Sequence, residues 1–580
     1  MRRLLLGMVF ALANPAFASP STDLKAVVDQ HWRWWLENHP VEATSLGVHD
    51  WDMLLDDISL GAADRQAADE QKFLDRMTAI PDAGLSDNER VDKGVLAEIL
   101  RTDVAGNRFG ERQMLFTTYY SWPQGFAGLA DNLPFRTGHD YESYVARLSQ
   151  YPQYNAEAMK ITRAAVAGGY VQPCAVLEGF EKTITGVIAA SPEQTRFYAP
   201  FLRAKPVDMD EAAWTALKSR AAAVIRDSVE PEYKRFADYY LAEYKPHCRA
   251  SVGASEMPQG RDWYALQVRL HTTSDLTPEQ IHQKGLSEVA RIRAEMDAVA
   301  KGAGYPSRAA MIAHMRSDPA SYVTTPRALL QAAAYQNKLI DGLLPRYFGK
   351  LPRLTFTVKP IPAETAEGTT TAYSQPGSIE SGVAGVYFVN TSKLDQRPLY
   401  ELPALTAHEA SPGHQLQLSL QQELALSEFR KHVASFTAYV EGWALYTEHL
   451  GAEMGLYDTP EKDMSRLSYE MWRACRLVVD TGLHSKGWTK AQAIAFMHDN
   501  TALTDANIEA EVNRYISWPG QALGYKLGEL KIRELRARAE KTLGSKFDLR
   551  AFHDEVLGLG PVPLDVLERE VDSWVAARAR

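Results

Sequence analysis

The decisive stretch of this sequence is HEASPGH, residues 408–414. A helix with two histidines four residues apart, and a glutamate directly after the first, presents two nitrogen ligands and a general base to one zinc ion. Here the second histidine follows the first by six residues. Positions six apart on a regular helix are separated by about 600° of rotation and point about 120° apart. A straight helix therefore cannot direct both side chains at one ion.

A proline and a glycine between the histidines predict a break in this helix. Pro412 has no N–H to donate to the carbonyl of His408, and Gly413 permits a sharp backbone path. One geometry is a bulge that swings His414 back towards His408. Another is a second helix capped by Ser411, with Pro412 at its first position and the ligands meeting across the junction. The spacing also allows two unrelated histidines at a helix end.

A third ligand is expected from the predicted helix YVEGWALYTE, residues 439–448. Glu441 is followed by Gly442, and glycine costs about 1 kcal/mol relative to alanine inside a helix. This glycine therefore indicates the close approach of another element. Glu448, near the same face, either holds a ligating histidine from behind or is an ordinary solvated acid.

Together these residues make up a hydrolytic zinc site, which has three protein ligands and one open position for water. We expect His408, His414 and Glu441 to bind one zinc ion. Glu409 is then the general base that takes a proton from the attacking water.

Strand patterns concentrate just upstream of the motif, at LTFTV (354–358) and GVYFV (385–389). We expect a small β-sheet beside the motif helix. An edge strand there can hold a substrate backbone by strand addition, which makes Tyr387 a candidate substrate-binding residue. The alternative is a purely structural hairpin.

A predicted helix over residues 466–484 carries a polar stripe of Glu470, Arg473, Asp480 and His484. For Glu470 and Arg473 we favour structural salt bridges. Asp480 and His484 form an i,i+4 pair, in which the aspartate could orient His484 as a catalytic residue towards the transition state.

Aromatic and basic residues gather again near residues 514–526. Zinc peptidases place a Tyr or His donor where the oxyanion develops, and Tyr515 and Tyr525 are the candidates. Arg514 and Lys526 are candidates for pairing with a substrate carboxylate. The alternative is that both tyrosines pack with Trp518 beside the core.

The length and charge of the chain indicate its domain organisation and its classes of partner. The chain has 580 residues, 45% hydrophobic and 23% charged, with a net charge of −10. We expect no nucleic-acid partner, because Lys and Arg are spread without a basic patch. We divide the chain into an N-terminal helical region (19–255) and a catalytic region (256–580), or one continuous domain. The fold class expected is mainly α, with a deep cleft.

The first 18 residues are typical of a cleavable signal peptide, with Arg2 and Arg3 before a short apolar run and a small-x-small site. We expect an exported, periplasmic or secreted protein without stable membrane insertion or a lipid anchor. Export permits a disulfide between Cys174 and Cys248. Cys475 lies in an apolar stretch and is expected to be a buried thiol.

Several ordered blocks resemble the bacterial family called domain of unknown function 885. They are HTTSDLTPEQIH (271–282), GVYFVNT (385–391), HEASPGHQLQ (408–417), YVEGWALY (439–446), LSYEMWRACR (467–476) and WPGQALGYKLG (518–528). The resemblance implies a relationship to thermolysin-like metallopeptidases. The segment EGWA at 441–444 also resembles one in aminopeptidase N-like enzymes, whose glutamate is the third zinc ligand.

The function expected is a zinc metallopeptidase that hydrolyses peptide bonds, preferably of short peptides. One alternative is a metal-dependent hydrolase of another amide or ester. The other is a non-catalytic peptide-binding protein of the same fold. The sequence leaves open the oligomeric state, the native metal and the bond that is cleaved.

Overall fold

Helices make up most of this protein. The computed structural model describes residues 19–117, 120–131, 133–367, 369–379 and 382–580. The predicted signal peptide lies outside the described residues. No helix of the described segments is long and apolar enough to cross a membrane.

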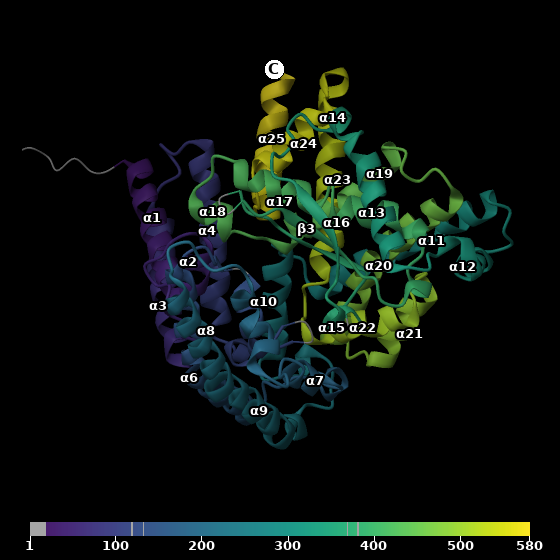
Figure 1. Cartoon of the computed structure of the whole chain (residues 1–580). Coiled ribbons are helices and arrows are strands. Elements are labelled where there is room, and N and C mark those ends of the chain that lie inside the picture. Colours follow the sequence, from purple (N-terminus) through teal and green to yellow (C-terminus); the bar gives the residue numbers. More distant parts are fainter. Residues whose placement is uncertain (1–18, 118–119, 132, 368, 380–381) are drawn as a thin grey trace, which may run out of the picture.

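The helices are numbered in chain order (Figure 1). Those up to residue 272 are α1 (Pro20–Asn38), α2 (Pro40–Ser45), α3 (Leu60–Ala79), α4 (Asp87–Gly106), α5 (Trp122–Ala127), α6 (Gly138–Gly168), α7 (Phe180–Thr185), α8 (Glu211–Val224), α9 (Glu230–Tyr239) and α10 (Gly260–Thr272). Those that follow are α11 (Pro278–Gly302), α12 (Arg308–Ser317), α13 (Pro326–Asp341), α14 (Leu344–Tyr347), α15 (Ala363–Ala366), α16 (Leu402–Glu409), α17 (His414–Glu423), α18 (Glu428–His432), α19 (Thr437–Glu453), α20 (Pro460–Ser485), α21 (Lys490–Asn500), α22 (Asp505–Ser517), α23 (Leu523–Leu543), α24 (Leu549–Gly558) and α25 (Leu564–Ala579).

Capping residues set several helix starts. At the start of α11, Thr277 and Gln280 form a capping box, and Pro278 is the first helical residue. Likewise, Thr459 caps α20 directly before Pro460. Side chains from Met464 to His484 of α20 are buried on all faces, which is typical of a helix at the centre of a large protein.

Two large hydrophobic cores hold the helices together. One joins α1 and α4 to α19, α23 and α25, and includes Leu24, Leu100 and Trp443. The other joins α6 and α9 to α20 and α22, and includes Tyr233 and Val478. Both cores therefore take side chains from each side of the predicted boundary at residues 255 and 256. Helix α10 contacts α4 as well as α19, α20 and α23.

The small sheet lies beside the motif helix, as predicted. Its strands β1 (Phe356–Pro360), β2 (Ala372–Gln375) and β3 (Gly385–Val389) lie in the order β1-β3-β2. Strand β3 pairs in parallel with β1 and antiparallel with β2. Strand β2, which the sequence pattern did not indicate, contacts both α16 and α17. One edge of the sheet is thus placed at the histidine motif.

The structure settles the disulfide that the sequence left open and confirms the buried thiol that it predicted. Cys174 and Cys248 form a disulfide, and Cys475 is a buried free thiol.

Candidate metal centre

The histidine motif spans a junction between two helices. His408 and Glu409 end α16, and His414 begins α17. Between them Ala410 leaves the helical region with φ −100° and ψ −117°, and the Ser411–Pro412 peptide bond is cis. The ligands therefore meet across a junction. The predicted cap was wrong, because Gly413 rather than Ser411 precedes the first residue of α17.

Gly413 is required by close approach of the backbone. A Cβ atom at this position would lie 1.9 Å from the carbonyl oxygen of His408 and 2.5 Å from that of Ala407. Across the junction, the amide of Gln415 donates to the carbonyl of Ala410 at 3.1 Å. The two helix ends are thus closed tightly onto one another, which only glycine allows.

Helix α19 lies against this junction and supplies the third side chain. Trp443 donates its indole N–H to the carbonyl of Pro412 at 3.0 Å, and Thr447 donates to the carbonyl of Ala407 at 2.8 Å. The close approach predicted at Gly442 is confirmed, since a Cβ there would lie 2.5 Å from Cα of Gly528 in α23. Helices α19 and α23 therefore pack closely at the residue that follows Glu441.

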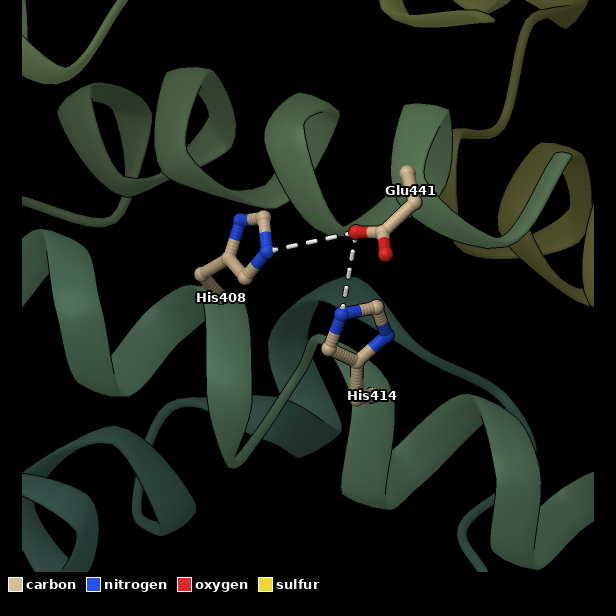
Figure 2. A group of neighbouring side chains, drawn as sticks. All are labelled: His408, His414 and Glu441. Carbon is tan, nitrogen blue, oxygen red and sulfur yellow. Dashed lines mark ion pairs between the residues drawn. The ribbon is translucent and has the colours of Figure 1, made fainter. Parts of the chain in front are cut away.

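Figure 2 shows His408, His414 and Glu441 pointing towards one another from the three helices. Oε2 of Glu441 lies 3.3 Å from Nε2 of His414 and 3.6 Å from Nε2 of His408. One ligand atom from each residue lies within 4.8 Å of the others. Zinc bonds of about 2.1 Å in a tetrahedron place ligand atoms about 3.4 Å apart. The spacing therefore fits a small divalent metal such as zinc.

Electrostatic interactions among these three side chains shift the pKa values of His408 and Glu441. Burial alone would lower the pKa of His408, but its contacts with Glu441 and Glu448 outweigh burial and raise this pKa to about 9. Burial alone would raise the pKa of Glu441, but the imidazoles of His414 and His408 hold it well below its usual range. Glu441 therefore offers an ionised carboxylate to a cation.

Glu448 contacts the ring nitrogen of His408 that is turned away from Glu441. It therefore has the first of the two roles considered for it, that of holding a candidate ligand histidine. Its Oε1 lies 2.7 Å from Nδ1 of His408, and the side chain is 2% exposed. Because Nδ1 faces this carboxylate, Nε2 is the nitrogen turned towards Glu441. This is the usual way in which a carboxylate orients a ligating histidine.

Glu409, the predicted general base, is half-buried at the end of α16. Its backbone carbonyl accepts a hydrogen bond from Ser374 Oγ of strand β2. In addition, the side-chain Nε2 of Gln415 donates to the backbone carbonyls of Gln375 and Val386, at 3.0 Å each. The sheet edge is therefore fixed to both sides of the motif.

The two candidate tyrosines differ sharply. The hydroxyl of Tyr515 accepts from Trp472 Nε1 and Arg476 Nε, at 2.9 Å each, and donates to Glu511 at 2.7 Å. The ring of Tyr525 lies 6.4 Å from that of His408 at 11°, and its hydroxyl has a long 3.4 Å contact with Gln521 Nε2. Burial and then the charge of Glu441 raise the pKa of Tyr525. The structure thus brings Tyr525, not Tyr515, beside the candidate ligand His408.

Arg514 lies near the ring of Tyr525. Its guanidinium donates to Glu511 at 3.2 Å, and its Cζ is 5.9 Å from the Tyr525 ring centroid. The side chain is 10% exposed. Its predicted contact with a substrate carboxylate stays a prediction.

His484 is not held by Asp480, contrary to the predicted pair. Its Nδ1 accepts from the amide of Ala254 at 3.0 Å, and its Nε2 donates to the carbonyl of Tyr515 at 2.9 Å. Asp480 instead accepts from the Tyr264 hydroxyl at 2.6 Å and from the Gly520 amide. Both His484 nitrogens are engaged by backbone, so the structure gives His484 a structural role.

Two other predicted residues are also enclosed. The ammonium group of Lys526 is fully buried and pairs with Glu470 at 2.8 Å, Glu529 at 2.9 Å and Glu288 at 3.3 Å. Tyr387 is fully buried, with its hydroxyl 3.4 Å from Thr406 Oγ1. The structure places neither side chain on a surface that a substrate could reach.

Sequence reasoning missed the residues that support the ligands. Trp443 contacts the junction, Ser374 of the edge strand contacts the backbone of Glu409, and Arg473 contacts Glu448. The structural salt bridges expected of Glu470 and Arg473 are present, but with partners from other helices: Glu470 pairs with Lys526 and Arg473 with Glu448. A motif of six-residue spacing carries no signal for these partners, since they lie far from it in the sequence.

Comparison with known proteins gives the family. The family model "Bacterial protein of unknown function (DUF885)" matches residues 40–571. A solved structure described as "the putative lipoprotein from Colwellia psychrerythraea" is 28% identical, with a TM-score of 0.89 over 96% of this chain and 100% of that one. A second, from Shewanella oneidensis, is 20% identical with a TM-score of 0.71 over 95% and 99%, and shares the fold. No curated protein matches. The chain belongs to the DUF885 family of bacterial proteins.

Proposed function

We propose that this protein is an exported zinc metallopeptidase that hydrolyses short peptides, related to the thermolysin-like enzymes. One observation carries the proposal: two imidazole nitrogens and one carboxylate oxygen from separate helices converge at 3.3 and 3.6 Å. Two His and one Glu are a ligand set typical of hydrolytic zinc. A bound zinc ion would lower the pKa of water to about 7 and polarise a carbonyl group.

Glu409 is the residue that would take the proton of the attacking water. It directly follows the ligand His408, and among the described residues no cation forms a salt bridge with its carboxylate. A carboxylate free of a cation can accept that proton and pass it to the leaving amine.

Tyr525 supports the carbonyl that is attacked. Its ring lies beside His408, and its hydroxyl is only weakly engaged by Gln521 at 3.4 Å. A phenol hydroxyl in a buried site can donate to the oxygen on which negative charge develops. The edge strand β2, fixed to Glu409 through Ser374, would align the substrate backbone by strand addition.

Export is supported by two facts. The first 18 residues have the pattern of a cleavable signal peptide. The similar solved structures are described as "putative" lipoproteins, which are exported proteins. The predicted cleavage site leaves Ser19, the residue that caps α1, as the first residue of the mature chain.

The test combines metal analysis with one conservative substitution. Purified protein should hold about one zinc per chain, and it should cleave members of a short-peptide library. Glu409→Gln preserves the size of the side chain and should keep the metal while hydrolysis falls by about 10³-fold.

Each alternative has its own outcome. Full peptide hydrolysis by Glu409→Gln would exclude the proposed base. Zinc-loaded protein that is inert to peptides but cleaves esters or other amides would identify a different hydrolase. Peptide binding without any turnover would identify a binding protein.

A further inference from the structure

Helix α20 carries two buried arginines one turn apart, Arg473 and Arg476. Their side chains are 5% and 3% exposed. Their Cζ atoms lie 4.5 and 4.6 Å from the ring centroid of Trp472. Buried cations are costly unless they are paired, so the groups that these arginines hold indicate their roles.

Arg473 is directed at the ligand side of the centre. One of its terminal nitrogens lies 3.0 Å from Oε1 of Glu448, the same oxygen that lies 2.7 Å from Nδ1 of His408. Its other terminal nitrogen donates to the carbonyl of Tyr469 at 3.2 Å. The guanidinium is therefore anchored to its own helix and holds the Glu448 carboxylate against His408.

Arg476 is directed at the tyrosine side. Its Nε donates to the Tyr515 hydroxyl and a terminal nitrogen to Glu511, both at 2.9 Å. Its Cζ lies 4.2 Å from the ring centroid of Tyr525. The planar cation is thus fixed along one edge, and its face supports the ring that lies beside His408.

We propose that Arg473 and Arg476 are positioning residues of the metal centre with separate tasks. Arg473 acts through Glu448 and orients His408 so that Nε2 faces Glu441 and His414. Arg476 acts on Tyr525 and sets where its hydroxyl donates. The second task rests on the function proposed above, whereas the first requires only that the centre binds a metal.

The first task is tested by zinc affinity, measured by competition with a chromophoric chelator. Arg473→Met should weaken zinc binding by about 10- to 100-fold, as loss of an orienting contact does, and Arg473→Lys should recover part of it. Glu448→Gln, which retains the shape of the side chain, should show the same loss as Arg473→Met. Arg476→Met should bind zinc as the wild type does.

Two controls keep this result clear. Lys462→Met changes a cation at the start of the same helix, where Lys462 pairs with Asp458 at 2.6 Å, and should alter nothing. Near-ultraviolet circular dichroism establishes that each variant is folded. Wild-type zinc affinity in both folded Arg473→Met and folded Glu448→Gln would overturn the first task, whether or not the protein hydrolyses peptides.

The second task is tested on the zinc-loaded protein with a peptide phosphonate, whose tetrahedral oxygens imitate the attacked carbonyl. Arg476→Met should weaken phosphonate binding by about tenfold and lower kcat by a similar factor, with KM little changed. Arg476→Lys should restore part of both.

A double-mutant cycle separates positioning from general damage. If Arg476 acts through Tyr525, then adding Arg476→Met to Tyr525→Phe should have little further effect on phosphonate affinity. Fully additive losses would overturn the second task. A wild type that binds phosphonate without turnover would refute the proposed function while the cycle still tests Arg476.

Discussion

His414 and His484 are both buried histidines, and the structure uses them in opposite ways. Both nitrogens of His484 are bonded to backbone groups, of Ala254 and Tyr515. The Nε2 of His414 instead lies 3.3 Å from a carboxylate oxygen, and its Nδ1 has no hydrogen-bond partner among the described residues. Their exposed fractions, 8% and 0%, do not separate them.

This contrast shows how a binding site differs from a polar core. Both nitrogens of the His484 ring already have partners, so neither is left to hold a ligand. At the metal centre, Oε2 of Glu441 is buried without a hydrogen-bond partner. Because such groups are costly, their convergence indicates a site that a cation completes.

The strongest contrast is expected between alanine substitutions of the two histidines. His414→Ala should weaken zinc binding by about 3 kcal/mol or more, since three ligands share a binding free energy of order 10 kcal/mol. His484→Ala should keep zinc but lower the free energy of unfolding by about 2–4 kcal/mol, because two backbone groups lose their partners. Chelator competition and denaturant unfolding measure the two effects. Retention of zinc by His414→Ala would remove it from the ligand set.

The tyrosines extend the comparison to catalysis. Tyr525→Phe should lower kcat by about 10²-fold through loss of one donor to the oxyanion, with zinc content unchanged. Tyr515→Phe should mainly lower stability, by about 1–3 kcal/mol, since it leaves buried partners unpaired. Steady-state kinetics on a cleaved peptide measures the first effect. Equal kcat in Tyr525→Phe and wild type would assign the donor elsewhere.

The junction itself can be strained by one methyl group. In Gly413→Ala, the new Cβ would meet the His408 carbonyl at 1.9 Å, so we expect a loss of about 1–3 kcal/mol in stability, together with weaker zinc binding. Gly558→Ala is the matched control, because nothing lies within 4 Å of its Cβ position at the end of α24. It should be neutral or stabilising by less than about 1 kcal/mol. Thermal unfolding with and without zinc compares them.

The smallest expected effect is the pH dependence of stability at His484. Burial lowers the pKa of His484 from its ordinary value of 6.5 to about 3. Below pH 6.5, His484 binds a proton in the unfolded chain but not in the folded chain, so the free energy of unfolding falls as the pH drops towards 3. At pH 5.5 this residue should cost about 1 kcal/mol. Denaturant unfolding of wild type and His484→Gln at pH 7 and 5.5 should show a weaker pH dependence in the variant.

The sequence predicted more of the centre than of its surroundings. His408, His414, Glu441 and the glutamate behind them all lie where the motif and the EGWA segment indicated. These residues could be predicted because their types and their spacing in the sequence are typical of a metal site. The structure does not support the roles expected of His484, Lys526 and Tyr387. Each of these side chains is buried and contacts residues from elsewhere in the chain. A polar residue in a helix pattern does not show whether it is already paired.

The sequence alone indicated the candidate ligand types, the break at Pro412 and Gly413 and the mainly helical class, whereas it only permitted the disulfide. These follow from local chemistry: which atoms bind a metal, which backbone can bend and which residues start a helix. Three features came only from the tertiary structure. The candidate ligands meet across two helix ends, Tyr525 rather than Tyr515 lies beside His408, and Arg473 pairs with Glu448. The physical reason is that each of these depends on contacts between residues tens of positions apart, which packing alone selects.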